Sequence, residues 1–200
     1  MRKEIITHLS KDSNLKKLIE TVEIAPAQER GDLYSSLMRA IVGQQLSVKA
    51  ASTIHGRFMD LFEDGYAYPE ELLAMDLPIL KSVGLSRQKS GYVQNIAHFF
   101  TENELQDKDW ESMTDDEVID FLTPIKGVGK WTVQMILMFT LHRDDVFPVD
   151  DLGIQNSMRN IYKMEETGRA FKAKMKKISL TWQPYRTHAC RLLWRWQDQI

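Results

Sequence analysis

Apolar residues recur along most of this chain at the three- to four-residue spacing of an α-helix. From Leu33 to Ile41 they occupy positions i, i+1, i+4, i+5 and i+8, which share one helical face. Comparable stripes lie in residues 51–62, 92–100, 131–141, 152–162, 170–180 and 187–196. Alternating apolar and polar residues, the pattern of a half-buried strand, are nearly absent. The pattern therefore predicts an all-α protein of about nine or ten helices.

Two local signals predict where helices begin. Thr114 and Glu117 have the spacing of a capping box, which indicates a short helix through Phe121. Pro69 stands before two glutamates, as a proline in the first turn of a helix does, because its missing N–H costs nothing there.

Composition narrows the chemistry. Apolar residues make up 43% of the chain and charged residues 27%, as in an ordinary globular protein. A single cysteine, Cys190, excludes a disulfide framework, a four-thiolate zinc site and a cysteine-held iron–sulfur cluster, and we expect it to be a small buried side chain. The five histidines are scattered without metal-ligand spacing, which argues against a metalloenzyme.

The charge distribution leaves the choice of partner open. The net charge of −2 and a pI near 6.2 argue mildly against nucleic acid. Acidic residues are concentrated in 102–120, however, and basic ones in 172–177 and 186–195. We see neither a signal peptide nor an apolar run of the ~20 residues that a membrane span needs, so we expect no membrane association and a cytoplasmic location.

The segment from Leu122 to Thr132 has the pattern of a tight turn between two helices. Pro124 blocks continuation of the first helix, two glycines at 127 and 129 bracket apolar Val128, and a second helix is expected from Lys130. Glycine amides and the free N–H groups of a helix's first turn together make a small anion pocket. A plain helix–helix turn without a ligand is the alternative.

Two carboxylates, Asp150 and Asp151, follow the apolar segment 146–149 at the start of the next expected helix. Helix capping alone explains an acid at this position. We take Asp150 as the cap or a supporting group and Asp151 as the chemical group, although composition by itself does not rank them.

Four blocks, in order, resemble the helix-hairpin-helix (HhH-GPD) DNA glycosylase superfamily, most closely its bacterial 3-methyladenine DNA glycosylase II type. The blocks are residues 39–47, 84–89, 127–132 with 148–151, and 182–194. The resemblance covers roughly residues 34–196. It implies one all-α domain over 1–200, with two interlocked helical lobes at approximately 30–125 and at 1–29 plus 126–200. The active-site cleft is expected between the lobes. The chain is too short for the N-terminal β domain of the related bacterial enzyme.

The resemblance also implies an activity and a catalytic residue. Asp151-Leu-Gly-Ile154 has the register of the family's essential aspartate, so Asp151 inherits that role. Lyase-type members carry a lysine two positions after the second hairpin glycine. Trp131 stands there, and Lys130 is one place early, which turns a helical side chain by ~100°. The implied enzyme is a monofunctional, monomeric glycosylase that removes 3-methyladenine and 7-methylguanine from double-stranded DNA at the nucleoid.

The remaining site residues follow from the same resemblance. The expected base-pocket residues are Trp131, Trp194, Tyr34, Phe147, Met135 and Leu152; the last two positions are often tyrosine in the related enzyme, which leaves the substrate range open. The expected DNA contacts are Gly127, Gly129, Lys130 and Thr132, with Gln45 or Leu46 filling the gap left by the flipped base; packing as a helix staple is the alternative for Leu46. No cofactor is required, and a structural Na⁺ or K⁺ is expected on the carbonyls of Thr123, Ile125 and Val128. We expect Trp182 and Trp196 to lie in the core.

The chemistry fits a cationic lesion. An alkylated purine carries positive charge, which attracts aromatic faces and makes the base a good leaving group without a general acid. One carboxylate can then stabilise the oxocarbenium-like sugar and direct a water to C1′. A glycosylase for oxidised or mismatched purines and a non-catalytic HhH DNA-binding module remain the alternatives.

Overall fold

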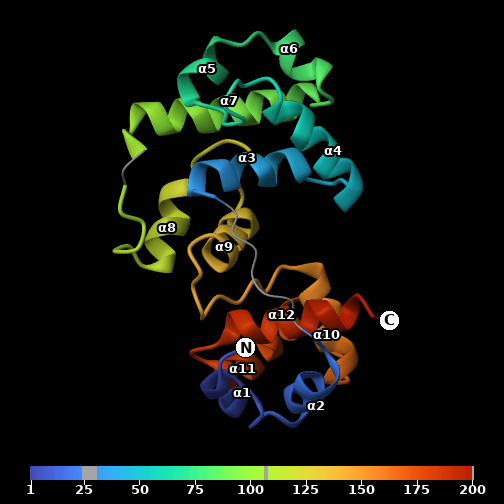
Figure 1. The fold of residues 1–200 in the computed structure, drawn as a ribbon. Helices are drawn as coiled ribbons and strands as arrows, with labels where there is room; N and C mark the ends of the chain where they lie inside the picture. The colour runs from blue at the N-terminus through green and yellow to red at the C-terminus, as the bar shows by residue number, and fades with distance from the viewer. Residues whose placement is uncertain (24–30, 106–107, 200) are drawn as a thin grey trace. The chain divides into compact units, whose positions relative to one another are not determined.

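The structure, a computed structural model, describes residues 1–23, 31–105 and 108–199. Within these ranges the chain forms twelve α-helices and a short 3-10 helix and contains no β-strand (Figure 1). The all-α prediction is therefore confirmed. The count exceeds the expected one because the sequence pattern does not reveal three short helices: α1 (Lys3–Leu9), α2 (Ser13–Thr21) and α6 (Leu77–Ser82). In the described part of the chain, no helix is long and apolar enough to cross a membrane.

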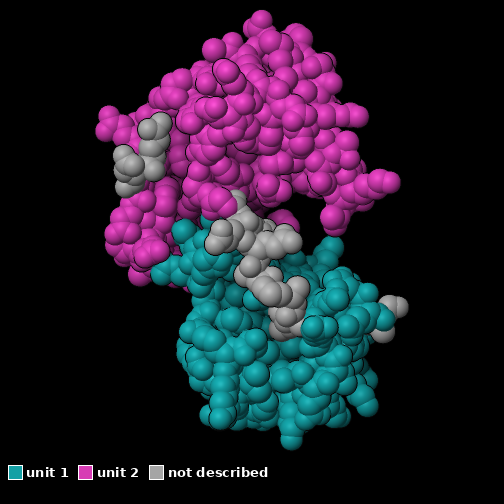
Figure 2. Space-filling model, in the orientation of Figure 1, with its two compact units in different colours: residues 1–28, 137–200 teal, residues 29–136 magenta. Residues whose placement is uncertain are grey.

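The chain divides into two compact units, coloured separately in Figure 2. Unit 1 joins Met1–Gln28 to Leu137–Ile200, and unit 2 is the intervening segment Glu29–Ile136. The expected lobe boundary at residue 126 differs from this division, because residues 126–136 belong to unit 2. The hairpin packs on helices of that unit, as described below.

Unit 2 is built around α7 (Arg87–Glu102), which lies between α5 (Pro69–Ala74) and α6 on one side and α3 (Leu33–Gly43) on the other (Figure 1). The unit also contains α4 (Val48–Met59), α8 (Asp115–Leu122) and the first part of α9 (Lys130–Phe139). The core includes the fully buried Leu37, Ile41, Val93 and Ile96 on the facing sides of α3 and α7. Both predicted start signals are confirmed: α8 opens with the capping box, and Pro69 stands in the first turn of α5.

Unit 1 combines the two N-terminal helices with α10 (Leu152–Ile161), α11 (Gly168–Ser179), η2 (Leu180–Trp182) and α12 (Arg186–Gln197). Helix α12 packs against both α10 and α2. One carboxylate joins these parts: Asp12 caps α2 and accepts hydrogen bonds from the Tyr162 hydroxyl at 2.7 Å and the Trp182 indole at 3.2 Å. Trp182 is fully buried, as expected, whereas Trp196, also expected in the core, is only half-buried. Cys190 is buried too, and burial raises the pKa of its thiol.

The loop that leads to the aspartate pair is held by α12. The guanidinium of Arg186 donates to both carboxylate oxygens of Asp145, at 2.7 and 2.9 Å. Thr187 accepts from the amide of Val146 and donates to the carbonyl of Arg143. A two-pronged Arg–carboxylate pair fixes direction as well as distance, so the chain enters α10 along a defined path.

Candidate active site

The hairpin is anchored by its apolar residues. Leu122, Ile125 and Val128 are buried in unit 2, while Lys126 and Gly129 are exposed. Helix α9 begins at Lys130, as predicted, and its first backbone hydrogen bond runs from the Val133 amide to the Gly129 carbonyl at 3.1 Å. The turn is therefore exposed at Lys126 and Gly129, while its apolar residues hold it in place.

The two hairpin glycines have different requirements. Gly127 has a φ of +107°, and a Cβ there would lie 2.3 Å from Cγ of Tyr92 in α7, so both the backbone and the close approach require glycine. Gly129 has no left-handed φ, and a Cβ there would meet nothing within 4 Å. The carbonyl of Gly127 accepts from Nε2 of Gln44 at 3.2 Å, and that of Lys126 accepts from Nδ2 of Asn95 at 3.2 Å.

The loop between α3 and α4 carries the expected gap-filling residues. Gln45 is exposed with a φ of +57°, and Leu46 is 37% exposed. The Lys89 ammonium donates to the carbonyls of Val42 and Gln44, both at 2.8 Å, and burial lowers its pKa. Since the Gln44 side chain also bonds the Gly127 carbonyl, Lys89 and Gln44 connect the α3–α4 loop to the hairpin inside unit 2.

Asp151 is the N-cap of α10. Its Oδ1 accepts the amide of Ile154 at 2.9 Å and the indole N–H of Trp194 in α12 at 2.8 Å. Two donors converging on one oxygen fix the orientation of the carboxylate. Asp150 was expected to be the cap or a supporting group; the cap is wrong, because Asp151 takes that position and the Asp150 side chain pairs with Lys172 at 2.6 Å.

Gly153 lets Trp194 approach Asp151. A Cβ at position 153 would lie 3.0 Å from Cδ1 of Trp194 and 3.2 Å from Oδ1 of Asp151. The Trp194 ring also contacts Phe139, with centroids 5.9 Å apart. Trp194, predicted only as a base-pocket residue, is thus a positioning residue for the carboxylate.

The other expected pocket residues are divided between the units. In unit 2, Trp131 is 45% exposed on α9 and Met135 lies half-buried one turn further along, while Tyr34 lines an aromatic cavity that contains neither of them. In unit 1, Leu152 is 72% exposed, and Phe147 packs edge-on against buried Trp182. The expected pocket residues therefore form two sets, one in each unit.

Two further expectations concern the hairpin. Lys130 is exposed, as a phosphate contact must be. Thr132 is only 4% exposed, because the helical register turns it toward the core, and its expected phosphate contact is therefore not supported.

Of the three carbonyls expected to bind a cation, that of Ile125 accepts the Val128 amide at 2.9 Å, which uses one of its two lone pairs. Within the described ranges, no group of three His, Cys, Asp or Glu side chains is placed to hold a metal ion.

Comparisons with known proteins identify the family of this chain. Residues 38–183 match the family described as HhH-GPD superfamily base excision DNA repair protein. The chain belongs to this family. DNA-3-methyladenine glycosylase 1 of Schizosaccharomyces pombe is 36% identical over 207 residues, which cover 97% of this chain and 90% of that protein.

Solved HhH-GPD structures superpose closely on this chain. The S. pombe 3-methyladenine DNA glycosylase in complex with abasic DNA gives a TM-score of 0.83 at 35% identity, covering 98% of this chain and 97% of that one. A DNA-3-methyladenine glycosidase from Bacillus halodurans gives 0.84 at 33% identity, covering 98% and 89%.

Several residues of this HhH-GPD chain had no expected role. Gln44 and Lys89 lie in blocks that carried the resemblance, but a sequence does not show that Lys89 reaches the end of α3. Likewise, nothing in the spacing indicates that Trp194 bonds Asp151 across 43 residues. Gly153 gave a usable signal, since a glycine in the first turn of a helix is costly unless something packs against it.

Proposed function

We propose that this chain is a monofunctional DNA glycosylase that hydrolyses the N-glycosidic bond of alkylated purines in double-stranded DNA. The observation that carries the proposal is the carboxylate of Asp151, held by Ile154 and Trp194 at the start of α10. It occurs in a chain whose relatives, matched over nearly their whole length, are described as 3-methyladenine glycosylases.

The reaction follows from the charge of the lesion. When the bond between C1′ and the purine nitrogen breaks, its electron pair leaves with the base and cancels the positive charge of the ring. The sugar is then left with oxocarbenium character, which the Asp151 carboxylate stabilises. A water adds its oxygen to C1′, and its proton passes to the carboxylate. The Trp194 and Ile154 donors keep Oδ1 fixed, so the carboxylate does not have to reorient during the step.

The same proposal excludes strand cutting. A lyase needs an amine that forms a Schiff base with C1′. Trp131 occupies the position where lyase-type members carry that lysine, and Lys130 precedes it in the first turn of α9. We therefore expect base removal that leaves an abasic site and an intact strand.

DNA binding is proposed through exposed groups of unit 2. The amides of Gly127 and Gly129 and the Lys130 ammonium would hold a backbone phosphate, and Gln45 or Leu46 would occupy the gap left by the flipped base. The protein would act as a monomer in the cytoplasm, at the nucleoid.

A monovalent cation is proposed at the hairpin. The carbonyls of Thr123, Ile125 and Val128 would supply neutral oxygen ligands, and the cation would add positive charge near the phosphate. The side-chain amides of Asn95 and Gln44 occupy the carbonyls of Lys126 and Gly127 rather than these three. Melting temperatures in NaCl or KCl should exceed those in tetramethylammonium chloride at equal ionic strength; equal values would contradict the site.

The activity is tested by presenting one lesion at a time. Duplexes carrying 3-methyladenine, 7-methylguanine, 8-oxoguanine or a mismatched adenine are incubated with the protein, and released bases are measured by mass spectrometry. We expect release of the two methylated purines, with strand breaks only after alkali and no borohydride-trapped adduct. Release confined to 8-oxoguanine or adenine would point to an oxidised- or mismatched-purine enzyme. DNA binding without any release would point to a non-catalytic module.

A further inference from the structure

Lys89 lies in the first turn of α7, although a positive charge is unfavourable at that end of a helix. Ser86 caps the helix by accepting the Lys89 amide at 3.2 Å. Glutamate or glutamine is the favoured residue three positions after a serine cap, because its side chain returns to the cap amide. The other residues of the turn, Arg87 and Gln88, do not balance the charge either. Helix α7 itself therefore gives no reason for a lysine at position 89.

The ammonium of Lys89 instead binds the end of α3. It is half-buried and donates to the carbonyls of Val42 and Gln44, both at 2.8 Å. The last carbonyls of a helix have no partner within the helix, and a cation beside them complements the helix dipole. Residues 40–43, the last turn of α3, are all uncharged. Lys89 thus supplies from α7 the cation that the end of α3 lacks.

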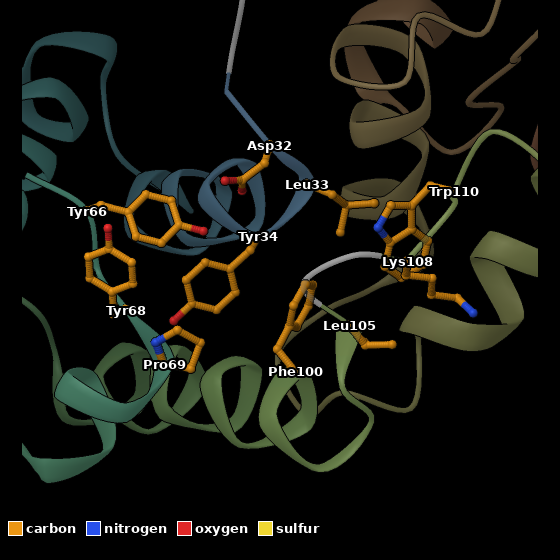
Figure 3. Close-up of a pocket in the computed structure, with 10 residues that line it drawn as sticks. All are labelled: Asp32, Leu33, Tyr34, Tyr66, Tyr68, Pro69, Phe100, Leu105, Lys108 and Trp110. Atoms are coloured by element: carbon orange, nitrogen blue, oxygen red, sulfur yellow. The ribbon is translucent and has the colours of Figure 1, made fainter.

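The two ends of α3 are held in different ways. At its start, Asp32 caps the helix, and Tyr34 packs among the aromatic side chains around a cavity of unit 2 (Figure 3). Tyr34 is only 5% exposed, and its ring centroid lies 5.0 Å from that of Phe100 in α7. The residues that follow the other end, Gln45 and Leu46, are exposed. Apolar packing therefore fixes the start of α3, whereas polar contacts hold the α3–α4 loop after its end.

Holding the Gln44 carbonyl also orients the residue that follows. This carbonyl and the amide of Gln45 belong to one peptide plane, so Lys89 fixes the plane from which Gln45 continues the chain. Gln45 has a φ of +57°, which is uncommon for a residue other than glycine. The Leu46 amide then bonds the Gly43 carbonyl at 3.2 Å. Lys89 thereby sets the direction of the exposed part of the α3–α4 loop.

Gln44 extends the same contact to the hairpin. Its side-chain amide donates to the Gly127 carbonyl at 3.2 Å, while its backbone carbonyl accepts from Lys89. The loop expected to fill the gap in the duplex and the turn expected to bind a phosphate are therefore joined through one residue. A displacement of the loop away from Lys89 would change the position of one DNA contact relative to the other.

We propose that Lys89 is a positioning residue for base flipping: it holds the α3–α4 loop so that the loop enters the duplex while the hairpin binds the backbone. Lys89 acts through Gln45 and Leu46 and makes no contact with the lesion. It should therefore affect the step in which the nucleotide leaves the stack, and not the general attraction of the protein for DNA. The inference deepens the proposed function and rests on it for the roles of the loop and the hairpin.

The test compares substrates that differ in how much flipping they require. Single-turnover release of 7-methylguanine is measured from a duplex in which it pairs with cytosine and from one in which it faces an abasic site. An unpaired base leaves the stack at lower cost, so its release depends less on the loop. Lys89→Met removes the ammonium and should slow release about tenfold from the paired duplex but less than about threefold from the unpaired one. The affinity for an undamaged duplex should stay within about twofold of the wild type, because the phosphate contacts remain.

Three controls separate positioning from folding. Because the two rates come from the same variant, a partial loss of folded protein lowers both equally. Lys89→Arg, which keeps a charged donor, should recover most of the rate on the paired duplex. Lys81→Met removes the charge of an exposed lysine in α6 and should behave as the wild type does. A Lys89→Met variant that is slowed equally on both duplexes, or on neither, would overturn the inference.

A double-mutant cycle tests whether Lys89 acts through the loop. The combined change Gln45→Ala and Leu46→Ala truncates the side chains that enter the duplex. In this background, Lys89→Met should slow release from the paired duplex less than about twofold further, because the loop that it positions no longer fills the gap. A further loss of about tenfold would mean that Lys89 acts elsewhere, and it would contradict the inference.

A binding signal separates failure of this inference from failure of the proposed function. The fluorescent base 2-aminopurine, placed opposite an abasic site, reports entry of the loop into the stack without any base release. If the wild type excises methylated purines and Lys89→Met matches Lys81→Met in rate and fluorescence, the positioning role is wrong and the function stands. If no base is released from any duplex but Lys89→Met lowers the fluorescence change at saturating protein, the proposed function is wrong and the positioning role stands.

Discussion

Asp151 is both a helix cap and the proposed catalytic group. The two hydrogen bonds that hold its carboxylate end on a single oxygen. The donors from Ile154 and Trp194 both bind Oδ1. Capping usually explains an aspartate at the start of a helix, but it does not require an indole donor from another helix. The Trp194 bond is therefore the feature that distinguishes Asp151 from an ordinary cap.

Removing that donor should slow excision without unfolding the protein. Trp194→Phe keeps an aromatic ring beside Phe139 but removes the N–H. A hydrogen bond to a charged group contributes about 1.5–3 kcal/mol, so the single-turnover excision rate should fall about 10- to 100-fold. Affinity for an abasic duplex should change little. The matched control is Trp196→Phe, two residues along the same helix; a Trp194→Phe variant as fast as this control would contradict the positioning role.

At the scale of elements, Gln44, Lys89 and Tyr92 connect the α3–α4 loop, α7 and the hairpin within unit 2. The sequence blocks at 39–47, 84–89 and 127–132 thus form one hydrogen-bonded assembly, although they are far apart along the chain. This arrangement gives the exposed Gln45 and Leu46 a fixed base next to the proposed phosphate-binding turn.

The hairpin glycines offer a matched pair of substitutions. Gly127→Ala places a Cβ against Tyr92 in a backbone conformation that L side chains rarely adopt, and it should reduce the free energy of unfolding by about 1–3 kcal/mol. Gly129→Ala meets open space and should leave stability nearly unchanged. Urea unfolding of both variants decides the matter. Equal losses in the two would mean that the close contact between Gly127 and Tyr92 is not what demands glycine.

Apolar periodicity predicted the longer helices well, because each has a buried stripe. It missed α1, α2 and α6, which have six to nine residues. In α2 only Leu15 and Leu18 are buried, and Asp12, its cap, accepts hydrogen bonds from Tyr162 and Trp182 in the C-terminal half of the chain. Such helices are stabilised by tertiary contacts that a local pattern does not contain.

At the scale of the whole molecule, the family register predicted the hairpin turn and assigned the proposed catalytic role to Asp151, whereas the tertiary partners of these residues were not predictable. Local order along the chain distinguishes Asp151 from Asp150. It does not reveal that Asp150 pairs with Lys172, that Trp194 bonds Asp151, or that Tyr34 joins four other aromatic residues around a cavity. These contacts depend on how distant helices pack.

Global stability should depend on pH through His55 in α4. Burial, with a smaller effect of Arg39, lowers the pKa of His55 from 6.5 to about 4. Between these pH values the unfolded chain binds more protons at His55 than the folded chain does. The contribution of His55 to the free energy of unfolding is therefore fully present above pH 6.5 and is lost as the pH falls toward 4. The free energy of unfolding of the wild type minus that of His55→Gln, both measured by urea unfolding, should increase as the pH rises across this window. A constant difference would refute the assignment.

The most direct test of the proposed catalysis is the Asp151→Asn variant, measured for both excision and binding. Asparagine still accepts the Ile154 amide as an N-cap, so the melting temperature and the affinity for an abasic duplex should stay near those of the wild type. Single-turnover release of 7-methylguanine should fall at least about 100-fold, because the charge that stabilises the sugar and accepts the proton is gone. Release at a near-normal rate, from a variant that folds and binds DNA, would contradict the central role of Asp151.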